Sequence, residues 1–415
     1  MSTVRGLRYD DGCETRKDVV KTEGYYVHYK DREDPVLDIT CGYGAFVLGY
    51  NNKELFDRIH SNYDVAFLRG VANETTEQEE ELNDIILDYG NWEGVSWAVS
   101  GSDAVEAMMA MVDKYYELTE GGQERRKIIT LFPCYVGTTM FGKHVRRKYE
   151  YWDRIVEVDA PMWLTYDQQE TEEARALADL RTKLEEDKAK KKPEIGSLLM
   201  ETSPWLDDMV PWSPNFWLEI RKLCDEFDIL WAVDDVAVCW GKFGTWFGWQ
   251  QFGVQPDVSS IGKALTAGYS PFGAAVCNKK VFDVLNTESW DHAHTWHPNM
   301  WGVTAAIQTT KLIEHHNYLA NVPENNAKIM KIANEFKLTA RGSNSMVCID
   351  LPIELNAQDF WEFGLATGLP IQARQTPGQL KIVTPLIADD EYFQVLYDRV
   401  EKMFKHYKIG TFGSE

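Results

Sequence analysis

The sequence predicts an α/β protein built on a mostly parallel sheet that is flanked by helices. Between about residues 55 and 300, short apolar runs typical of buried strands alternate with segments of helical period. The chain has 415 residues, which is more than a single core usually holds, and 44% of them are hydrophobic. We therefore expect a large domain, with its binding crevice beyond the carboxyl ends of the strands, and a smaller second domain.

The predicted elements of the large domain alternate along the chain. The expected strands lie in residues 95–102, 127–132, 195–201, 228–235 and 272–278. The expected helices are residues 81–90, 104–118 and 215–227, together with an exposed, charge-rich helix in 168–194.

The pattern changes after residue 300. A long helical stretch over residues 300–322 precedes a mixture of short strands and helices, of which residues 389–407 are an example. We interpret this region as a connecting helix followed by a smaller α+β domain. The N-terminal residues 36–52 are expected to become part of that domain. The expected parts are an N-terminal segment of residues 1–55, a large domain of residues 56–315 and a C-terminal small α+β domain of residues 316–415.

Composition restricts the possible partners. The formal net charge of −22 would repel a phosphate backbone. No stretch approaches the roughly 20 apolar residues of a membrane span, and the charged start does not resemble a signal peptide. The seven cysteines lack close pairs, which argues for reduced thiols. We expect a cytoplasmic protein that binds neither nucleic acid nor membrane.

One lysine stands in a run of small and apolar residues, "DVSSIGKALTAGYSPFG". Shielding from water lowers the pKa of a lysine and makes its neutral, nucleophilic amine accessible, which a Schiff-base lysine needs. Lys263 is therefore a candidate catalytic residue. The alternative is a lysine whose amine reaches solvent from the end of a strand.

Three further candidates lie at the ends of predicted strands. Asp234 can hydrogen-bond and protonate a pyridine nitrogen, although Asp234 or Asp235 can equally cap the next turn. Tyr135 can stack on a cofactor ring, whereas a tyrosine of the core is the simpler interpretation. Glu201 also ends a strand, which by itself indicates little.

A candidate phosphate site follows the first of these strands. Ser100, Gly101 and Ser102 precede a helix that Asp103 opens, and free backbone N–H groups at a helix N-terminus bind anions. The alternative is an ordinary helix cap.

Three histidines in "HAHTWHPN" have a spacing that suggests a metal site. No cysteine stands nearby in the sequence to complete a zinc site, and the loop already has another interpretation. We therefore expect no metal, and expect His292, His294 and His297 to line the entrance to the active site.

Taken together, the order and spacing of these segments resemble the class III, fold type I pyridoxal-phosphate (PLP) aminotransferases, from about residue 38 to 400. "PDVSSIGKALTAGYSPFGA" is similar to the family's "PDIVTLGKALGGGYPPLGA", and "DDVAVCWGKFG" to its "DEVQTGFGRTG". Residues 100–102 resemble the family's serine-glycine-serine/threonine loop, residues 135–137 its "YHG", and residues 295–298 part of its "TYSGNP".

The resemblance implies the PLP-transferase fold type I and a PLP-dependent transaminase. Such an enzyme moves an amino group between an amine or amino acid and a keto acid or aldehyde by a ping-pong mechanism. Lys263 would form the Schiff base and later move the Cα proton, Asp234 would pair with the pyridine nitrogen and Tyr135 would stack on the ring. The other implied cofactor-binding residues are Gly101, Ser102, Glu201 and Thr295. Thr295 would reach the phosphate of the neighbouring subunit, which implies a homodimer with shared active sites.

The sequence departs from the family's pattern at several positions. Ala237 replaces a glutamine that supports the cofactor's phenolic oxygen, and Val136 replaces a histidine. Lys381 stands where an arginine usually binds a substrate carboxylate, and lysine lacks the planar fork that makes two parallel hydrogen bonds. Arg374 could compensate, so both are candidate substrate-binding residues.

The substrate and the reaction stay open on sequence alone. Trp205, Trp240 and Trp296 favour a bulky or apolar substrate, although tryptophans of the core are the commoner explanation. Because geometry decides which bond PLP chemistry breaks, a decarboxylase, aminomutase or racemase is an alternative. A binding protein that kept the fold and lost turnover is another.

Overall fold

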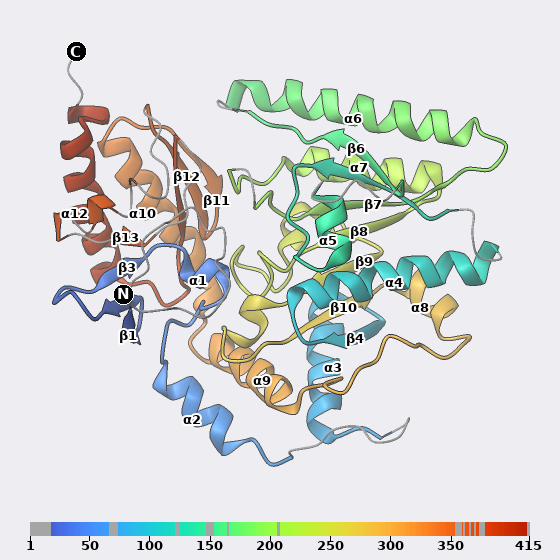
Figure 1. The fold of residues 1–415 in the computed structure, drawn as a ribbon, viewed down its shortest axis with the longest axis horizontal. Helices are drawn as coiled ribbons and strands as arrows, with labels where there is room; N and C mark the ends of the chain where they lie inside the picture. Colours follow the sequence, from blue (N-terminus) through green and yellow to red (C-terminus); the bar gives the residue numbers. More distant parts are fainter. Residues whose placement is uncertain are drawn as a thin grey trace, which may run out of the picture.

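The computed structural model describes residues 18–65, 74–120, 125–146, 153–163, 166–205, 208–352, 359, 362–364, 367–368, 371–372 and 378–412. A larger part of the chain, on the right of Figure 1, surrounds one central sheet. A smaller part, on the left, contains strands from both the beginning and the end of the chain.

The strands are β1 (Val19–Glu23), β2 (Tyr26–Tyr29), β3 (Val36–Asp38), β4 (Gly94–Ala98), β5 (Lys127–Phe132), β6 (Ile155–Asp159), β7 (Ile195–Glu201), β8 (Leu230–Asp234), β9 (Val258–Ile261), β10 (Gly273–Cys277), β11 (Ala340–Ser343), β12 (Met346–Asp350), β13 (Ile371–Gln372) and β14 (Gln379–Val383). The α-helices are α1 (Cys41–Gly44), α2 (Lys53–Ser61), α3 (Glu77–Gly90), α4 (Gly101–Glu120), α5 (Met140–Val145), α6 (Tyr166–Lys188), α7 (Pro214–Phe227), α8 (Lys279–Leu285), α9 (Met300–His315), α10 (Val322–Glu335) and α12 (Asp390–Tyr407). The 3-10 helices are η1 (Gly248–Phe252), η2 (Lys263–Thr266), η3 (Tyr318–Asn321) and η4 (Gly410–Phe412).

The central sheet has seven strands in the order β4-β10-β9-β8-β7-β5-β6. The neighbours from β9 to β6 are parallel, and β10 is antiparallel to both β4 and β9. Parallel strands bring their carboxyl ends to one edge of the sheet, and ligands bind in the crevice outside that edge. The prediction of a mostly parallel α/β sheet is confirmed.

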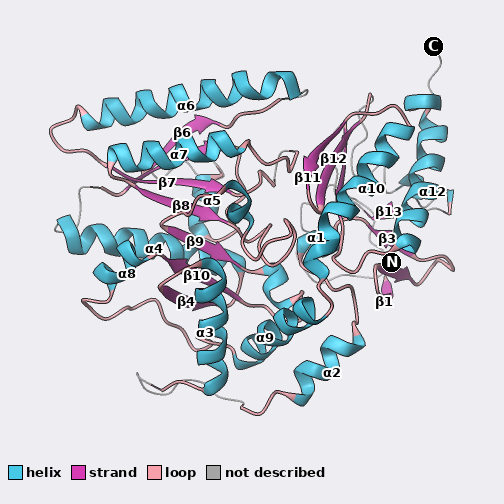
Figure 2. Cartoon of the chain, turned by 180° about the vertical axis from the view of Figure 1, so that it is seen from behind, coloured by secondary structure: helices cyan, strands magenta, loops and turns pink. Residues whose placement is uncertain are grey.

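Both faces of the sheet are covered by helices (Figure 2). Alternate residues of a strand point to opposite faces. Ile128 and Leu199 pack with residues of α4, α5 and α8 in one core cluster. Their neighbours Ile129 and Leu198 pack with residues of α6, α7 and α9 in another. Burial on both faces explains why these strands read as continuous apolar runs.

Helix α6 is less exposed than its charges suggested. Ala176, Leu180 and Leu184 are buried in the core, and the buried carboxylate of Glu173 accepts a 2.7 Å hydrogen bond from the backbone N–H of Ser213. The predicted ion pairs occupy its outer side, for example Arg175 with Asp179 at 3.1 Å. Among the described helices, none has both the length and the apolar character that a membrane span requires.

The smaller part combines segments from both ends of the chain. Strands β11, β12 and β14 form one antiparallel sheet, and β13 pairs in parallel with β3 in a second sheet. Leu37 and Ile39 share a core cluster with residues of α10 and α12, whereas Val47 and Leu48 belong to the core of the large part. The N-terminal segment thus contacts both parts, while the boundaries at residues 55 and 315 stay a prediction.

Arg341 of β11 links the two parts. Its guanidinium is fully buried, and donates two hydrogen bonds of 2.8 and 2.7 Å to the carboxylate of Asp350 on β12. It also donates to the backbone oxygen of Trp163, at 2.7 Å, and to the carboxylate of Asp208. These two partners lie in the loops that follow β6 and β7. The guanidinium of Arg341 therefore ties the sheet of β11, β12 and β14 to the loops at the carboxyl edge of the central sheet.

We predict that Arg341→Ala lowers the free energy of unfolding by about 3–5 kcal/mol, because it leaves the buried carboxylate of Asp208 and the half-buried carboxylate of Asp350 without their cation. Urea unfolding followed by circular dichroism measures the change. Lys222→Ala is the matched control, since Lys222 forms an exposed ion pair with Glu219 that is worth at most about 1 kcal/mol. Equal losses in the two variants would contradict the assigned role.

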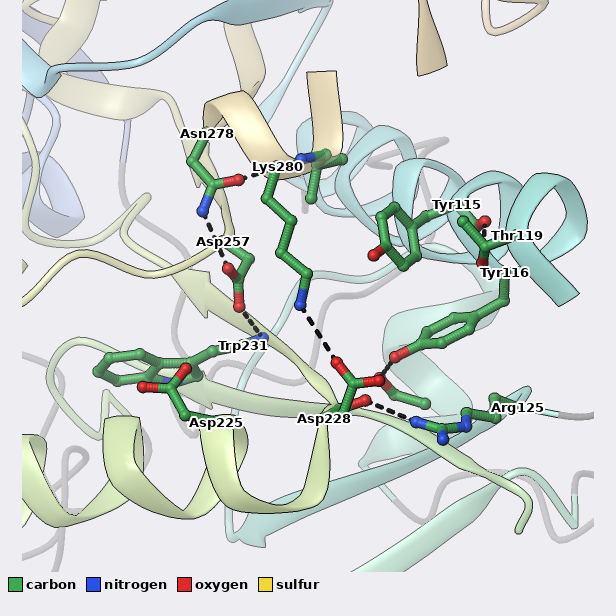
Figure 3. A network of polar contacts seen from close by, with 12 residues as sticks. Tyr115, Tyr116, Thr119, Arg125, Asp225, Asp228, Trp231, Asp257, Asn278 and Lys280 are labelled. Atoms are coloured by element: carbon green, nitrogen blue, oxygen red, sulfur yellow. Dashed lines mark hydrogen bonds and ion pairs between the residues drawn. The ribbon is translucent and has the colours of Figure 1, made fainter. Parts of the chain in front are cut away.

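A polar network fixes the opposite end of β8 (Figure 3). The carboxylate of Asp257 accepts hydrogen bonds from the backbone N–H of Trp231, at 2.8 Å, and from the side-chain amide of Asn278, at 2.9 Å. Lys280 lies 3.5 Å from Asp228, which ends α7 in the left-handed conformation. This anchoring at the amino end of β8 helps to set the position of Asp234 at its carboxyl end.

Candidate active site

The predicted site residues of four segments converge at the carboxyl edge of the sheet. Glu201 ends β7 directly beside Asp234 at the end of β8, and Asp234 lies beside Ser260 of β9. A methyl group added to Gly262 would lie only 3.3 Å from the Cα of Gly101. The turn that carries Lys263 therefore packs directly against the start of α4.

Lys263 occupies a strained turn at this edge. Its φ of 44° lies in the left-handed region, which side chains other than glycine rarely adopt. Its Nζ atom lies 4.3 Å from the ring centroid of Trp205. Burial and the charge of Lys242 lower the pKa of Lys263 to about 8. A substantial fraction of the amine is thus neutral near neutral pH, as a nucleophile requires.

Lys242 is a second buried amine that the sequence did not single out. Its side chain is fully buried, and Nζ donates a 3.3 Å hydrogen bond to the backbone oxygen of Cys239. Burial lowers the pKa of Lys242 as well. The residue stands in the quoted stretch "DDVAVCWGKFG", but nothing in that pattern indicates that its amine points inward.

We predict that Lys263 of the cofactor-free protein reacts with an amine-specific reagent with a midpoint near pH 8, well below the ordinary lysine value of about 10.4. Removal of the neighbouring charge in Lys242→Met should raise that midpoint. Peptide mass mapping of the label over a pH series measures both values. A midpoint unaffected by the substitution would contradict the proposed influence of Lys242.

Asp234 has an open acceptor oxygen. The side chain is 7% exposed, and its Oδ1 atom accepts hydrogen bonds from the backbone N–H of Val236, at 3.1 Å, and from the hydroxyl of Ser260, at 2.9 Å. Among the described residues, no hydrogen bond to Oδ2 is found. The turn-capping bond that was the alternative is therefore present, yet a second oxygen is available to a ligand. Burial raises the pKa of Asp234, whereas these two hydrogen bonds and the charge of Lys263 lower it.

Asp235 has a different task from its neighbour. Its carboxylate accepts hydrogen bonds from the hydroxyl of Thr202, at 2.5 Å, and from the backbone N–H of Gly248, at 2.9 Å. It is fully buried, so these bonds join β7, β8 and η1 inside the core. The two neighbouring acids, either of which could cap the turn by sequence alone, therefore have different partners.

Tyr135 and Glu201 are joined by a hydrogen bond. The buried carboxyl group of Glu201 accepts a 2.9 Å hydrogen bond from the backbone N–H of Tyr135. Burial and the charge of Asp234 raise the pKa of Glu201 to about 8, so this group is mostly protonated at neutral pH. The guanidinium of Arg146 lies 4.8 Å from the Tyr135 ring centroid. Arg146 was not predicted, because only the fold brings α5 back to this tyrosine.

Two glycines at the start of α4 and in the loop after β5 leave no room for larger residues. A Cβ atom on Gly101 would lie 2.4 Å from Cγ1 of Val236, and one on Gly137 would lie 2.8 Å from the hydroxyl oxygen of Ser102. That oxygen accepts a 3.1 Å hydrogen bond from the backbone N–H of Thr138, so its own proton can be donated. The helix start and this hydroxyl fit a phosphate group. Ser100 supplies the ordinary cap through a 3.1 Å bond from Asp103 N–H.

Thr295 is exposed on the surface of this chain. The loop that carries it is held by Asp103, whose carboxylate lies 3.1 Å from Nε2 of His294 and 3.6 Å from Nε2 of His292. Burial acts to raise the pKa of Asp103, but the nearby His292 and a hydrogen bond from the backbone N–H of Val99 lower it to about 2. His292 and His294 therefore lie beside the carboxylate of Asp103, which is in the first turn of α4 and far from these histidines in the sequence.

The substrate-binding roles of Lys381 and Arg374 stay predictions. Lys381 is buried on β14 beside Cys348, and its charge acts on the buried carboxyl group of Asp208, together with that of Arg341. Arg374 lies outside the described residues. Trp240 is fully buried and donates a 2.9 Å hydrogen bond to Thr310, so it belongs to the core. A cavity of about 500 Å³ lies nearby, and its walls include Trp163, Asp208 and Gln379.

A partly buried lysine of lowered pKa, a strand-end acid and a helix start with a glycine cradle, at the carboxyl edge of a mostly parallel sheet, fit the fold type I class of PLP enzymes, which the structural neighbours described below share. Within that class, the chain belongs to the class III aminotransferases, because the family model described as "Aminotransferase class-III" matches residues 11–404. This family depends on PLP, so the predictions of family, fold class, cofactor and transaminase activity are confirmed.

Several known proteins are similar to this chain. An uncharacterized aminotransferase of Schizosaccharomyces pombe is 26% identical over 72% of this chain and 68% of its own length. The chloroplastic gamma aminobutyrate transaminase 3 of Solanum lycopersicum is 26% identical over 73% of this chain, but the match covers only 61% of that relative.

Two solved structures show the same fold. An omega transaminase from Pseudomonas jessenii in complex with PMP has a TM-score of 0.83 at 18% identity, over 95% of this chain and 93% of that one. The taurine:2-oxoglutarate aminotransferase of Bifidobacterium kashiwanohense, in complex with PLP and glutamate, has a TM-score of 0.83 at 18% identity, over 94% and 93%.

Proposed function

We propose that this chain transfers amino groups between an amine or amino acid and a keto acid or aldehyde, with PLP held covalently by Lys263. The observation that carries the proposal is the combination of an amine of lowered pKa with a buried carboxylate whose Oδ2 oxygen is open. When bound, PLP supplies an aldehyde that reacts with amines and a ring that draws electrons from the carbon next to the amine nitrogen.

The chain's own groups would hold and orient the cofactor. Oδ2 of Asp234 is available to a protonated pyridine nitrogen, and Ser260 keeps the carboxylate in place through Oδ1. The Tyr135 ring, which Arg146 contacts, would pack on the cofactor ring. The N–H groups at the start of α4 and the hydroxyl of Ser102 would bind the phosphate.

Lys263 would also move the proton in the reaction. Nζ would take the proton from the substrate's α carbon and deliver it to the carbon on the other side of the amine nitrogen. A pKa of about 8 suits this exchange, since both protonation states are populated near neutral pH. Trp205 beside Nζ would exclude water from that side.

We also propose a homodimer with shared active sites. Thr295 is exposed, and its loop is held at the start of α4 by Asp103 and His294, so it is available to contact a second copy. Light scattering coupled to size-exclusion chromatography tests the dimer. We further propose a reducing compartment such as the cytoplasm, because the six described cysteines are buried and unpaired.

Half-reactions test the activity directly. The holoenzyme is mixed with single amino donors, including γ-aminobutyrate and taurine, which the names of the relative and the solved structure above suggest. Conversion of the cofactor to its amine form without a keto acid indicates transamination. Release of carbon dioxide, or racemization without such conversion, would contradict the proposal.

A further inference from the structure

Three potential metal ligands meet on the surface where α2 contacts the end of α9. Glu54 lies in the first turn of α2, His315 is the last residue of α9, and His316 caps that helix. One ligand atom from each residue lies within 4.8 Å of the other two. We propose that Glu54, His315 and His316 bind a divalent transition-metal ion, outside the site of the PLP chemistry.

The local contacts already orient the three side chains. Oε1 of Glu54 accepts two hydrogen bonds from Arg58, at 2.8 and 3.1 Å, whereas Oε2 points to Nε2 of His316 at 3.1 Å. The His316 ring stacks on Tyr318, with 5.0 Å between the centroids. Hydrogen bonding and stacking of this kind hold ligands in place around a metal.

The rings of His315 and His316 lie 4.8 Å apart at 77°, so their nitrogen atoms approach a common point from different directions. Ligands of a tetrahedral ion lie about 2.0–2.2 Å from its centre, which places them about 3.4 Å from one another. The present separations of up to 4.8 Å need only small side-chain rotations. Since all three residues are exposed, water can complete the shell.

The donor set selects the kind of ion. Two imidazoles and one carboxylate suit Zn²⁺, Ni²⁺ or Cu²⁺, whereas Mg²⁺ and Ca²⁺ prefer oxygen ligands only. The carbonyl groups at the end of α9 carry partial negative charge, which favours a cation there. Arg58 opposes the cation through its charge, and this predicts a site of moderate affinity.

A bound ion would connect two distant parts of the chain. Leu55 and Ile59 of α2 share a core cluster with Leu312 and Ile313 of α9, so the helices are already packed together. Helix α2 follows the segment that arrives from the smaller part, and α9 leads back to it through η3 and α10. Metal binding would therefore stabilise the pair of connections between the two parts.

Calorimetric titration of the untagged, chelator-treated holoenzyme with ZnCl₂ tests the site. We expect one saturable ion per chain, at least about tenfold weaker binding in Glu54→Gln, His315→Ala and His316→Ala, and no change in the control His60→Ala, an exposed histidine of the same α2 helix. We also expect zinc to raise the melting temperature of the parent protein and not that of His316→Ala.

Repetition in the cofactor-free Lys263→Ala variant excludes binding of zinc to PLP. X-ray absorption should show two imidazoles in the zinc shell. Unchanged affinity in His316→Ala, or several weak ions per chain bound by the acidic surface alone, would overturn the proposal.

Discussion

Lys263→Ala is expected to reduce the transamination rate by at least about 10²–10⁴-fold, the usual contribution of a positioned acid–base group. The loss should exceed that of any other single substitution, because the same amine is proposed to hold the cofactor and to move the proton. The steady-state rate with a reactive donor measures the loss. The absorbance of the bound cofactor should change in parallel, since an alanine cannot form the covalent link.

Lys279→Ala is the matched control for this experiment. Its side chain is 70% exposed and pairs with Asp283 of the same helix, α8. Lys279 has no proposed role in the active site. We expect it to retain the activity and absorbance of the parent protein. If Lys263→Ala kept more than a tenth of the activity, another lysine would have to carry the cofactor.

Asp234→Asn is expected to reduce the rate by about 10²–10³-fold, as the loss of one preorganised electrostatic contact in an active site typically does. The amide keeps the shape of the side chain and its bond from Ser260, but it lacks the negative charge that stabilises a protonated pyridine nitrogen. The absorbance and fluorescence of the bound cofactor should therefore shift as well, while the melting temperature changes little.

The neighbouring acid supplies a sharp comparison. Asp235→Asn disturbs the bonds to Thr202 and Gly248 in the core, so it should lower the melting temperature and leave the cofactor spectrum of the folded protein unchanged. The reverse pattern, with a shifted spectrum in Asp235→Asn alone, would show that the roles of the two acids had been exchanged.

The sequence predicted much of the large part because burial on both faces makes its strands plainly apolar. β5, β7 and β8 lie where continuous apolar runs placed them, and Glu201 and Asp234 end their strands as expected. The shared edge followed from the rule that parallel strands align their carboxyl ends. Local pattern was therefore sufficient to bring Lys263, Asp234 and Gly101 to one region.

Other features depend on contacts between distant segments, which local pattern does not contain. The inward direction of Lys242 and the central place of Arg341 arise only when separate loops meet, and the position of Arg146 beside Tyr135 depends on how the short helix α5 between them turns the chain back. Lys381 stays a predicted substrate ligand, and its electrostatic influence on the buried Asp208 could not be read from the motif. Helix α6 looked exposed because its buried stripe is narrow among many charges.

The central claim is that the amine of Lys263, and not that of the buried Lys242, holds the cofactor. Borohydride reduction of the holoenzyme makes the link between cofactor and amine permanent, and mass spectrometry of the peptides then locates it. Modification of Lys263 alone is the predicted result. A label on Lys242, or on any other lysine, would contradict the account.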